Sequence, residues 1–99
     1  MSTPLYLIAT IYPKAEHIDF LKQEFANFVS EAYMEPECEM YDLAQGEGED
    51  TWVVMEKWSS KASWDDHILT PHVKHMNSID KKFFRQPTDL GFLNPVPVK

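Results

Sequence analysis

Three of the chain's histidines, His67, His72 and His75, lie in one short stretch and form its only concentrated set of side chains that titrate near neutral pH. On a helix, His72 and His75 share one face because they are spaced i, i+3. Such a set can move protons to and from a bound small molecule, and we predict His67 and His72 as the catalytic residues. Two other interpretations stay open. The histidines cap helices or are solvated, or all three bind a metal ion, which requires the intervening turn to fold His67 back onto the helix face.

Large aromatic residues and one carboxylate accompany these histidines. Trp58 and Trp64 can form the wall of an aromatic pocket, although large aromatic residues are more commonly part of a core. Glu56 shares a strand face with Trp58, and a buried carboxylate there must be paired or hydrogen-bonded. We expect its partner to be Arg85, Lys57 of a second copy or a backbone amide. The predicted substrate-binding residues are Trp58, Trp64, Glu56, His75 and Met76.

The hydrophobic pattern predicts the elements that position these side chains. Alternating and β-branched apolar residues predict strands, whereas apolar residues spaced three and four apart predict amphipathic helices. Ser59 or Ser60 can cap one helix, and Thr70-Pro71 supplies the cap and first-turn proline of the next. The expected elements are strand 5–12, helix 15–33, strand 38–44, an acidic loop 45–50, strand 51–58, a short helix ending at 67, helix 71–84 and strand 90–93.

This order, β-α-β-β-α-β, predicts a ferredoxin-like α+β fold in one domain spanning residues 1–99, with 95–99 as an extended tail. Two long helices can cover only one face of the antiparallel sheet. The strands at 5–12 and 51–58 are apolar on both faces, so the second face also needs cover. We therefore expect a homodimer in which two copies pack sheet to sheet.

The composition restricts the partners and the compartment. Sixteen acidic residues against nine basic ones give a formal net charge of -7, which disfavours nucleic acid and anionic membrane surfaces. Cys38 is the single cysteine, and the first ten residues resemble neither a signal peptide nor a membrane span, so we expect a cytoplasmic protein. The chain has no glycine-rich phosphate loop and no CxxC pair, and we expect it to need no cofactor and no metal.

Three stretches in this order resemble the antibiotic-biosynthesis monooxygenase family. They are Glu35-Pro36-Glu37-Cys38-Glu39-Met40-Tyr41-Asp42-Leu43, Val54-Met55-Glu56-Lys57-Trp58 and His67-Ile68-Leu69-Thr70-Pro71-His72. Family members carry a Pro-Gly-Cys turn before a Tyr-containing strand, then a Glu-x-Trp strand end, a helix closing on His, and Pro-His or Ser-His at the next helix. Glu37 replaces the glycine of that turn.

The resemblance implies a dimeric α/β barrel with a pocket between sheet and helices in each subunit. It is closest to members that act on quinols, and it implies a monooxygenase that oxidises a quinol or related electron-rich aromatic molecule with dioxygen and no cofactor. Trp58 matches a pocket tryptophan of polyketide-tailoring members. Thr70-Pro71-His72 also resembles members that isomerise a phosphorylated autoinducer sugar, so an isomerase, or a ligand-binding protein without catalysis, is the alternative.

Overall fold

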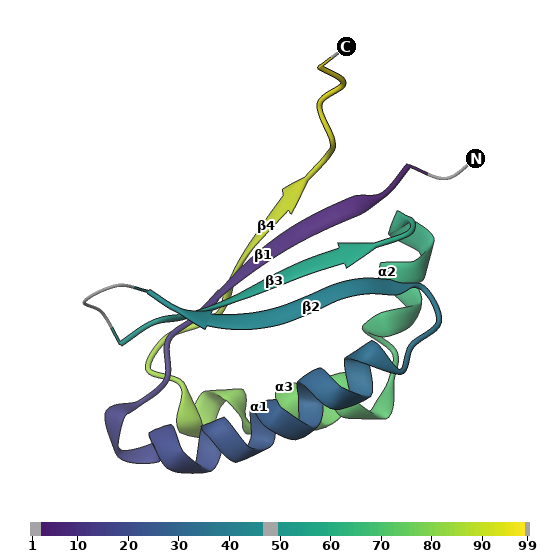
Figure 1. Cartoon of the computed structure of the whole chain (residues 1–99). Coiled ribbons are helices and arrows are strands. Elements are labelled where there is room, and N and C mark those ends of the chain that lie inside the picture. Colours follow the sequence, from purple (N-terminus) through teal and green to yellow (C-terminus); the bar gives the residue numbers. More distant parts are fainter. Residues whose placement is uncertain (1–2, 47–49, 99) are drawn as a thin grey trace.

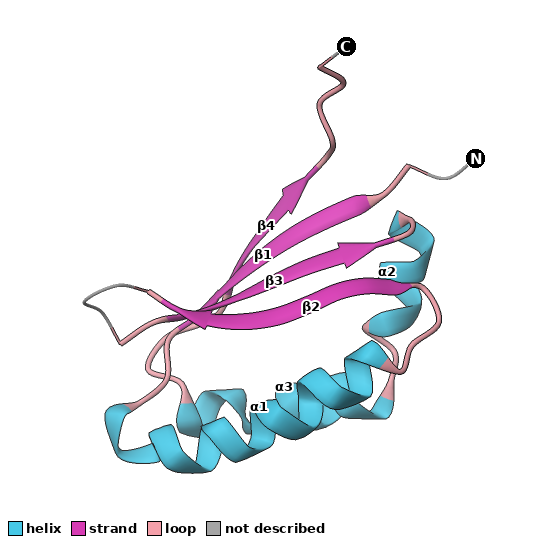
Figure 2. Ribbon diagram, in the orientation of Figure 1, coloured by secondary structure: helices cyan, strands magenta, loops and turns pink. Residues whose placement is uncertain are grey.

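A computed structural model describes residues 3–46 and 50–98 of the chain. Four antiparallel strands form one sheet in the order β2-β3-β1-β4, and helices α1 and α3 lie side by side on one of its faces (Figures 1 and 2). This is the predicted ferredoxin-like α+β arrangement. The elements are β1 (Leu5–Ile11), the 3-10 turn η1 (Ala15–His17), α1 (Ile18–Tyr33), β2 (Cys38–Gln45), β3 (Trp52–Trp58), α2 (Lys61–His67), α3 (Pro71–Phe83) and β4 (Asp89–Leu93).

Strands β1 and β3 form the centre of the sheet and show strict alternation of burial. Leu7 pairs with Glu56 and Ala9 with Val54, so these side chains share the face that the helices cover. The intervening residues, Ile8 among them, point to the other face, as the alternating pattern predicts. Ile8 is 40% exposed, and no helix of the described chain covers that face (Figure 1).

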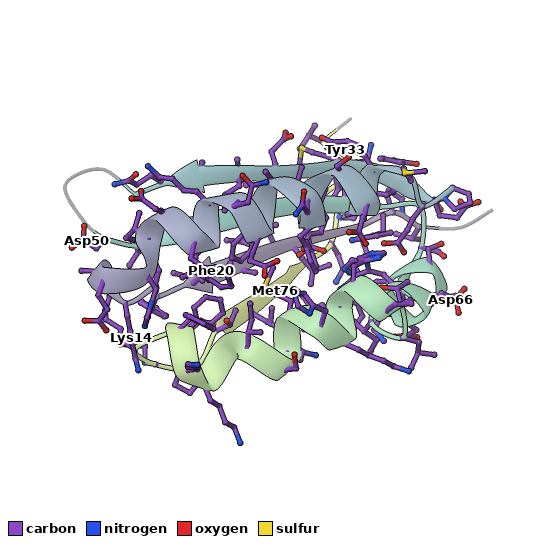
Figure 3. The ribbon with its side chains drawn as sticks, turned by 90° about the horizontal axis from the view of Figure 1, so that it is seen from below. Lys14, Phe20, Tyr33, Asp50, Asp66 and Met76 are labelled. Carbon is purple, nitrogen blue, oxygen red and sulfur yellow. The ribbon has the colours of Figure 1, made fainter. Side chains whose placement is uncertain are left out.

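Helix α1 buries one apolar stripe against the sheet, consisting of Leu21, Phe25, Phe28 and Ala32. The side chains of Phe20 and Met76 lie between α1 and α3 (Figure 3). The predicted helix start at residue 15 proves to be a 3-10 turn, and the α-helix begins at Ile18. The other boundaries agree with the predicted ones or differ from them by one residue.

Both predicted caps are present. The hydroxyl of Ser60 accepts a hydrogen bond from the Ser63 amide (3.1 Å), and that of Thr70 accepts one from the Val73 amide (3.4 Å). These bonds satisfy amide groups that the first helical turn leaves without partners. They fix the starts of α2 and α3, and the Thr70 cap lies in the turn between the two helices.

The predicted acidic loop joins β2 to β3, but its residues 47–49 lie outside the described residues, as does Lys99 of the predicted tail. Residues 95–98 have no regular structure and are exposed. Among the described residues, no helix combines the length and the apolar character needed to cross a membrane.

Candidate functional site

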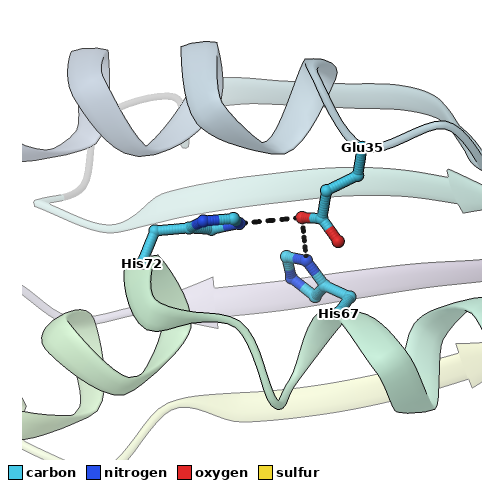
Figure 4. A group of neighbouring side chains, drawn as sticks. All are labelled: Glu35, His67 and His72. Carbon is cyan, nitrogen blue, oxygen red and sulfur yellow. Dashed lines mark hydrogen bonds and ion pairs between the residues drawn. The ribbon is translucent and has the colours of Figure 1, made fainter.

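One carboxylate oxygen holds two histidines together at the end of the helical layer. Oε2 of Glu35 lies 2.7 Å from Nδ1 of His67 and 2.8 Å from Nε2 of His72 (Figure 4). An ionised carboxylate can only accept, so both ring nitrogens donate. Nδ1 of His72 also lies 3.4 Å from Oε2 of Glu31. We call Glu35, His67 and His72 the Glu35 cluster.

Three helix ends create this cluster. Glu35 directly follows Met34, the C-cap of α1, while His67 is the last residue of α2 and His72 the second residue of α3. The turn between α2 and α3 is tightened because the Thr70 amide and hydroxyl both donate to the His67 carbonyl, at 3.1 and 2.7 Å. The predicted proximity of His67 and His72 is therefore present, and their ring centroids are 5.8 Å apart.

Burial controls the charge of His67. Its ring lies 4.4 Å from that of Trp58 and also contacts Tyr41 and Phe28, and its side chain is only 4% exposed. Desolvation lowers the pKa of His67, although the Glu35 carboxylate opposes this shift. A neutral His67 that donates from Nδ1 keeps Nε2 free to accept a proton.

A cavity of about 510 Å³ lies between the sheet and helix α3. Most of its wall is aliphatic or aromatic, and its polar side chains include Tyr41, Glu56, His67 and Asn77. No lysine or arginine is among the described residues that line it. Such a wall favours a neutral, flat, largely apolar molecule over a phosphorylated one.

Glu56 is the second buried titratable group of this cavity. Trp58 donates a hydrogen bond from Nε1 to Oε1 of Glu56 at 2.9 Å. The prediction that Arg85 or a backbone amide pairs with Glu56 is wrong, because the indole two residues along the same strand face fills that role; Arg85 instead donates to the carbonyls of Pro13 and Asp50. Burial raises the pKa of Glu56 to about 7.

A smaller cavity of about 170 Å³ lies between α1 and α3 and is lined by Glu24, Glu31, His72 and His75 among others. His75 is exposed, and its Nε2 lies 3.3 Å from both carboxylate oxygens of Glu24. His75 therefore does not join the Glu35 cluster, and a three-histidine metal site is not formed.

The predicted site residues separate into groups. His67, Trp64, Glu56 and Met76 line the larger cavity, whereas His72 and His75 line the smaller one together with Met76. Trp58 is fully buried behind His67 and lines neither cavity.

Glu35 and Tyr41 also belong to the site, and the sequence patterns do not predict them as site residues. A signal for Glu35 did exist, since α1 places Glu31 in its last turn and Glu35 just beyond, with no basic residue there. A helix C-terminus disfavours negative charge, so such carboxylates need a partner from elsewhere in the fold.

The Glu35 cluster also has the composition of a metal-ligand set. One ligand atom from each of its three residues lies within 4.8 Å of the others, and no other such group occurs in the described part of the chain. In the structure, hydrogen bonds join these three ligand atoms: Oε2 of Glu35 accepts from Nδ1 of His67 and from Nε2 of His72.

Comparisons with known proteins agree on one family. Residues 4–78 match the family model described as antibiotic biosynthesis monooxygenase. The crystal structure of PA3566 from Pseudomonas aeruginosa matches with a TM-score of 0.89 and 28% identity, covering 98% of each chain. A crystal structure of a protein called antibiotic biosynthesis monooxygenase matches with a TM-score of 0.88 and 28% identity, covering 94% of this chain and 99% of that one.

A third solved structure, Rv0793 from Mycobacterium tuberculosis, gives a TM-score of 0.90 at 21% identity, with 96% of this chain and 97% of that chain covered. At that identity the likeness shows the fold alone. No curated protein matches the chain.

Proposed function

We propose that this chain, which belongs to the antibiotic biosynthesis monooxygenase family, oxidises a neutral, electron-rich aromatic molecule such as a quinol with dioxygen and without a cofactor. The larger cavity carries the proposal. It combines an apolar wall suited to an aromatic ring with a histidine whose neutral tautomer is fixed by Glu35.

The chemistry needs a base, a dry pocket and an electron-rich substrate. Nε2 of His67 takes the phenolic proton, and Glu35 stabilises the resulting imidazolium through the Nδ1 hydrogen bond, whose length is 2.7 Å. The phenolate passes one electron to dioxygen, and the two radicals combine to form a carbon–oxygen bond. Cleavage of the oxygen–oxygen bond leaves one oxygen atom on the ring and releases the other as water.

This sequence of steps balances without an outside reductant. A quinol and dioxygen give a hydroxyquinone and water, and the substrate supplies all four electrons that reduce dioxygen. The proton held by His67 returns to the departing oxygen, so His67 acts first as base and then as acid. The apolar wall protects the radical pair from water.

The alternative of a phosphorylated-sugar isomerase has less support. A phosphate group needs cationic side chains or a helix N-terminus aimed at it. Among the described residues that line the larger cavity there is no lysine and no arginine, and Glu56 adds a carboxyl group there. A ligand-binding protein without catalysis is an outcome of the test below.

Oxygen uptake with a panel of quinols tests the proposed function, after the protein has been treated with a chelator. We expect uptake above that of heat-denatured protein, and one atom of ¹⁸O from labelled dioxygen in the quinone product. His67→Ala should lose this activity. Saturable binding of quinols with no oxygen uptake would contradict the proposal and indicate a binding protein.

We also propose that the uncovered face of the sheet packs against a second copy of the chain. Its apolar residues include Tyr6, Ile8, Val53, Met55 and Leu93, and two of them, Ile8 and Leu93, are 40% and 46% exposed. A contiguous apolar face of this kind is typical of an interface. A 99-residue chain also gains substantially from additional burial.

Sedimentation at micromolar concentration tests the dimer. We expect the wild-type chain to sediment as a dimer and Ile8→Glu to shift it toward the monomer. A wild-type monomer would contradict the proposal.

A further inference from the structure

The Glu35 cluster has three features of a metal site beyond its residue types. Its ligand atoms come from three separate helix ends, so the fold itself brings them together. Its two histidines are held by a single carboxylate oxygen, and no described lysine or arginine forms an ion pair with that carboxylate. Figure 4 shows both rings directing a nitrogen at that oxygen.

We propose that Glu35, His67 and His72 bind one divalent transition-metal ion through Oε2, Nδ1 and Nε2. Two imidazoles and one carboxylate suit Zn²⁺, Co²⁺ or Ni²⁺ better than Ca²⁺ or Mg²⁺, which prefer oxygen ligands.

The distances fit such an ion after a small movement. Ligands at about 2.1 Å from a tetrahedral ion such as Zn²⁺ are about 3.4 Å apart. Oε2 of Glu35 lies 2.7 and 2.8 Å from the two ring nitrogens. Replacing the two protons by one ion therefore requires the oxygen to separate from each nitrogen by roughly 0.6–0.7 Å, a shift that side-chain rotation can supply.

Glu31 supports the same site from outside. When Nε2 of His72 is a ligand, Nδ1 carries the proton and faces Oε2 of Glu31 at 3.4 Å. Metal-bound histidines commonly donate their second nitrogen to a carboxylate, and Glu31 is near enough to become that acceptor. Glu31 also lines the smaller cavity beside His72, through which water can reach the ion.

The ion would inhibit the oxygenation proposed above, and this consequence alone rests on the proposed function. A metal on Nδ1 of His67 displaces the proton to Nε2, and an Nε2–H group cannot accept the phenolic proton. The same residues therefore serve either as a base with its supporting carboxylate or as a metal site.

Calorimetric titration with Zn²⁺ and the visible absorption of added Co²⁺ test the site in the purified 99-residue chain. We expect one ion per chain with a dissociation constant in the micromolar range or below. Co²⁺ should also quench the fluorescence of Trp58, whose ring lies 4.4 Å from His67. Wild-type protein that binds neither ion would overturn the proposal.

Matched variants locate the ion. His72→Gln and Glu35→Gln should each weaken binding by about a hundredfold, and Glu31→Gln by about tenfold. His75→Gln, the control on the same helix, should stay within about twofold because His75 faces Glu24. Equal affinity of His72→Gln and wild type, or loss of binding in His75→Gln, would overturn the site, provided circular dichroism shows that the variants fold.

Oxygen uptake separates this proposal from the proposed function. If the wild type oxidises a quinol, saturating Zn²⁺ should lower turnover by about tenfold or more, and chelation should restore it. Unchanged uptake with the ion bound would overturn the inhibition. If no quinol is oxidised, the proposed function fails while the binding results still decide the metal site.

Discussion

Two histidine–glutamate contacts join the same helical layer, yet their surroundings differ. His67 meets Glu35 at 2.7 Å with its side chain 4% exposed, whereas His75 meets Glu24 at 3.3 Å with its side chain 56% exposed. Water screens the second pair and leaves it little net energy. The first pair is enclosed by Phe28, Tyr41 and Trp58, so its geometry and charge are set by the protein. The difference shows that burial, more than residue type, separates a candidate site from a surface contact.

The largest effect should come from removing the buried imidazole. His67→Ala deletes the proposed base, and general base catalysis contributes about 10²- to 10⁴-fold to a rate. Steady-state oxygen uptake with a quinol that the wild type oxidises measures this loss. A variant that folds and keeps more than about a tenth of wild-type turnover would assign the base to another residue.

Glu56 is a second buried titratable group in the wall of the larger cavity, so burial there should make the stability of the chain depend on pH. Its pKa is raised from 4.5 to about 7 in the folded chain. Between these values the unfolded chain releases this proton while the folded chain retains it, so the free energy of unfolding falls as pH rises through this window. The full shift corresponds to about 3 kcal/mol.

Glu56→Gln keeps the acceptor for the Trp58 indole but removes the titration. Urea unfolding at pH 5 and pH 8 should show the variant gaining stability relative to the wild type at the higher pH. Parallel pH dependence of the two proteins would show that Glu56 titrates as an ordinary carboxyl group.

The sequence was sufficient for the fold because local patterns decide it. Alternating burial in β3 and the capping residues Ser60 and Thr70 are visible in the sequence, and each prediction is confirmed. Boundaries were less accurate where competing local geometry intervened, as in the 3-10 turn at Ala15–His17.

The site was only partly predictable. The short turn between α2 and α3 brings His67 close to His72, but Glu35 reaches them from 32 and 37 residues away. The sequence singles out Glu35 only within the stretch that resembles the family's turn. For Glu56, the predicted partners were Arg85, Lys57 of a second copy or a backbone amide, whereas the observed donor is the indole of Trp58, two residues away on the same strand face.

A smaller effect on stability should follow from removing the charge of Glu35. Glu35→Gln retains the shape but replaces two charge-assisted hydrogen bonds with weaker ones, which we expect to lower the free energy of unfolding by about 1–2 kcal/mol. Urea unfolding at neutral pH measures this loss of stability. Glu24→Gln is the matched change at the exposed pair, and an equal loss in both variants would contradict the assigned role of burial.

The smallest effect should come from the exposed histidine. His75→Gln removes a contact at 3.3 Å whose histidine is more than half exposed, so the free energy of unfolding should change by less than about 0.5 kcal/mol. High salt should reduce even this difference, because water and ions already screen the pair. Urea unfolding at low and high salt checks both statements. A loss above about 1 kcal/mol would mean that His75 and Glu24 form a structural contact comparable to the Glu35 cluster, and that exposure alone does not distinguish the two sites.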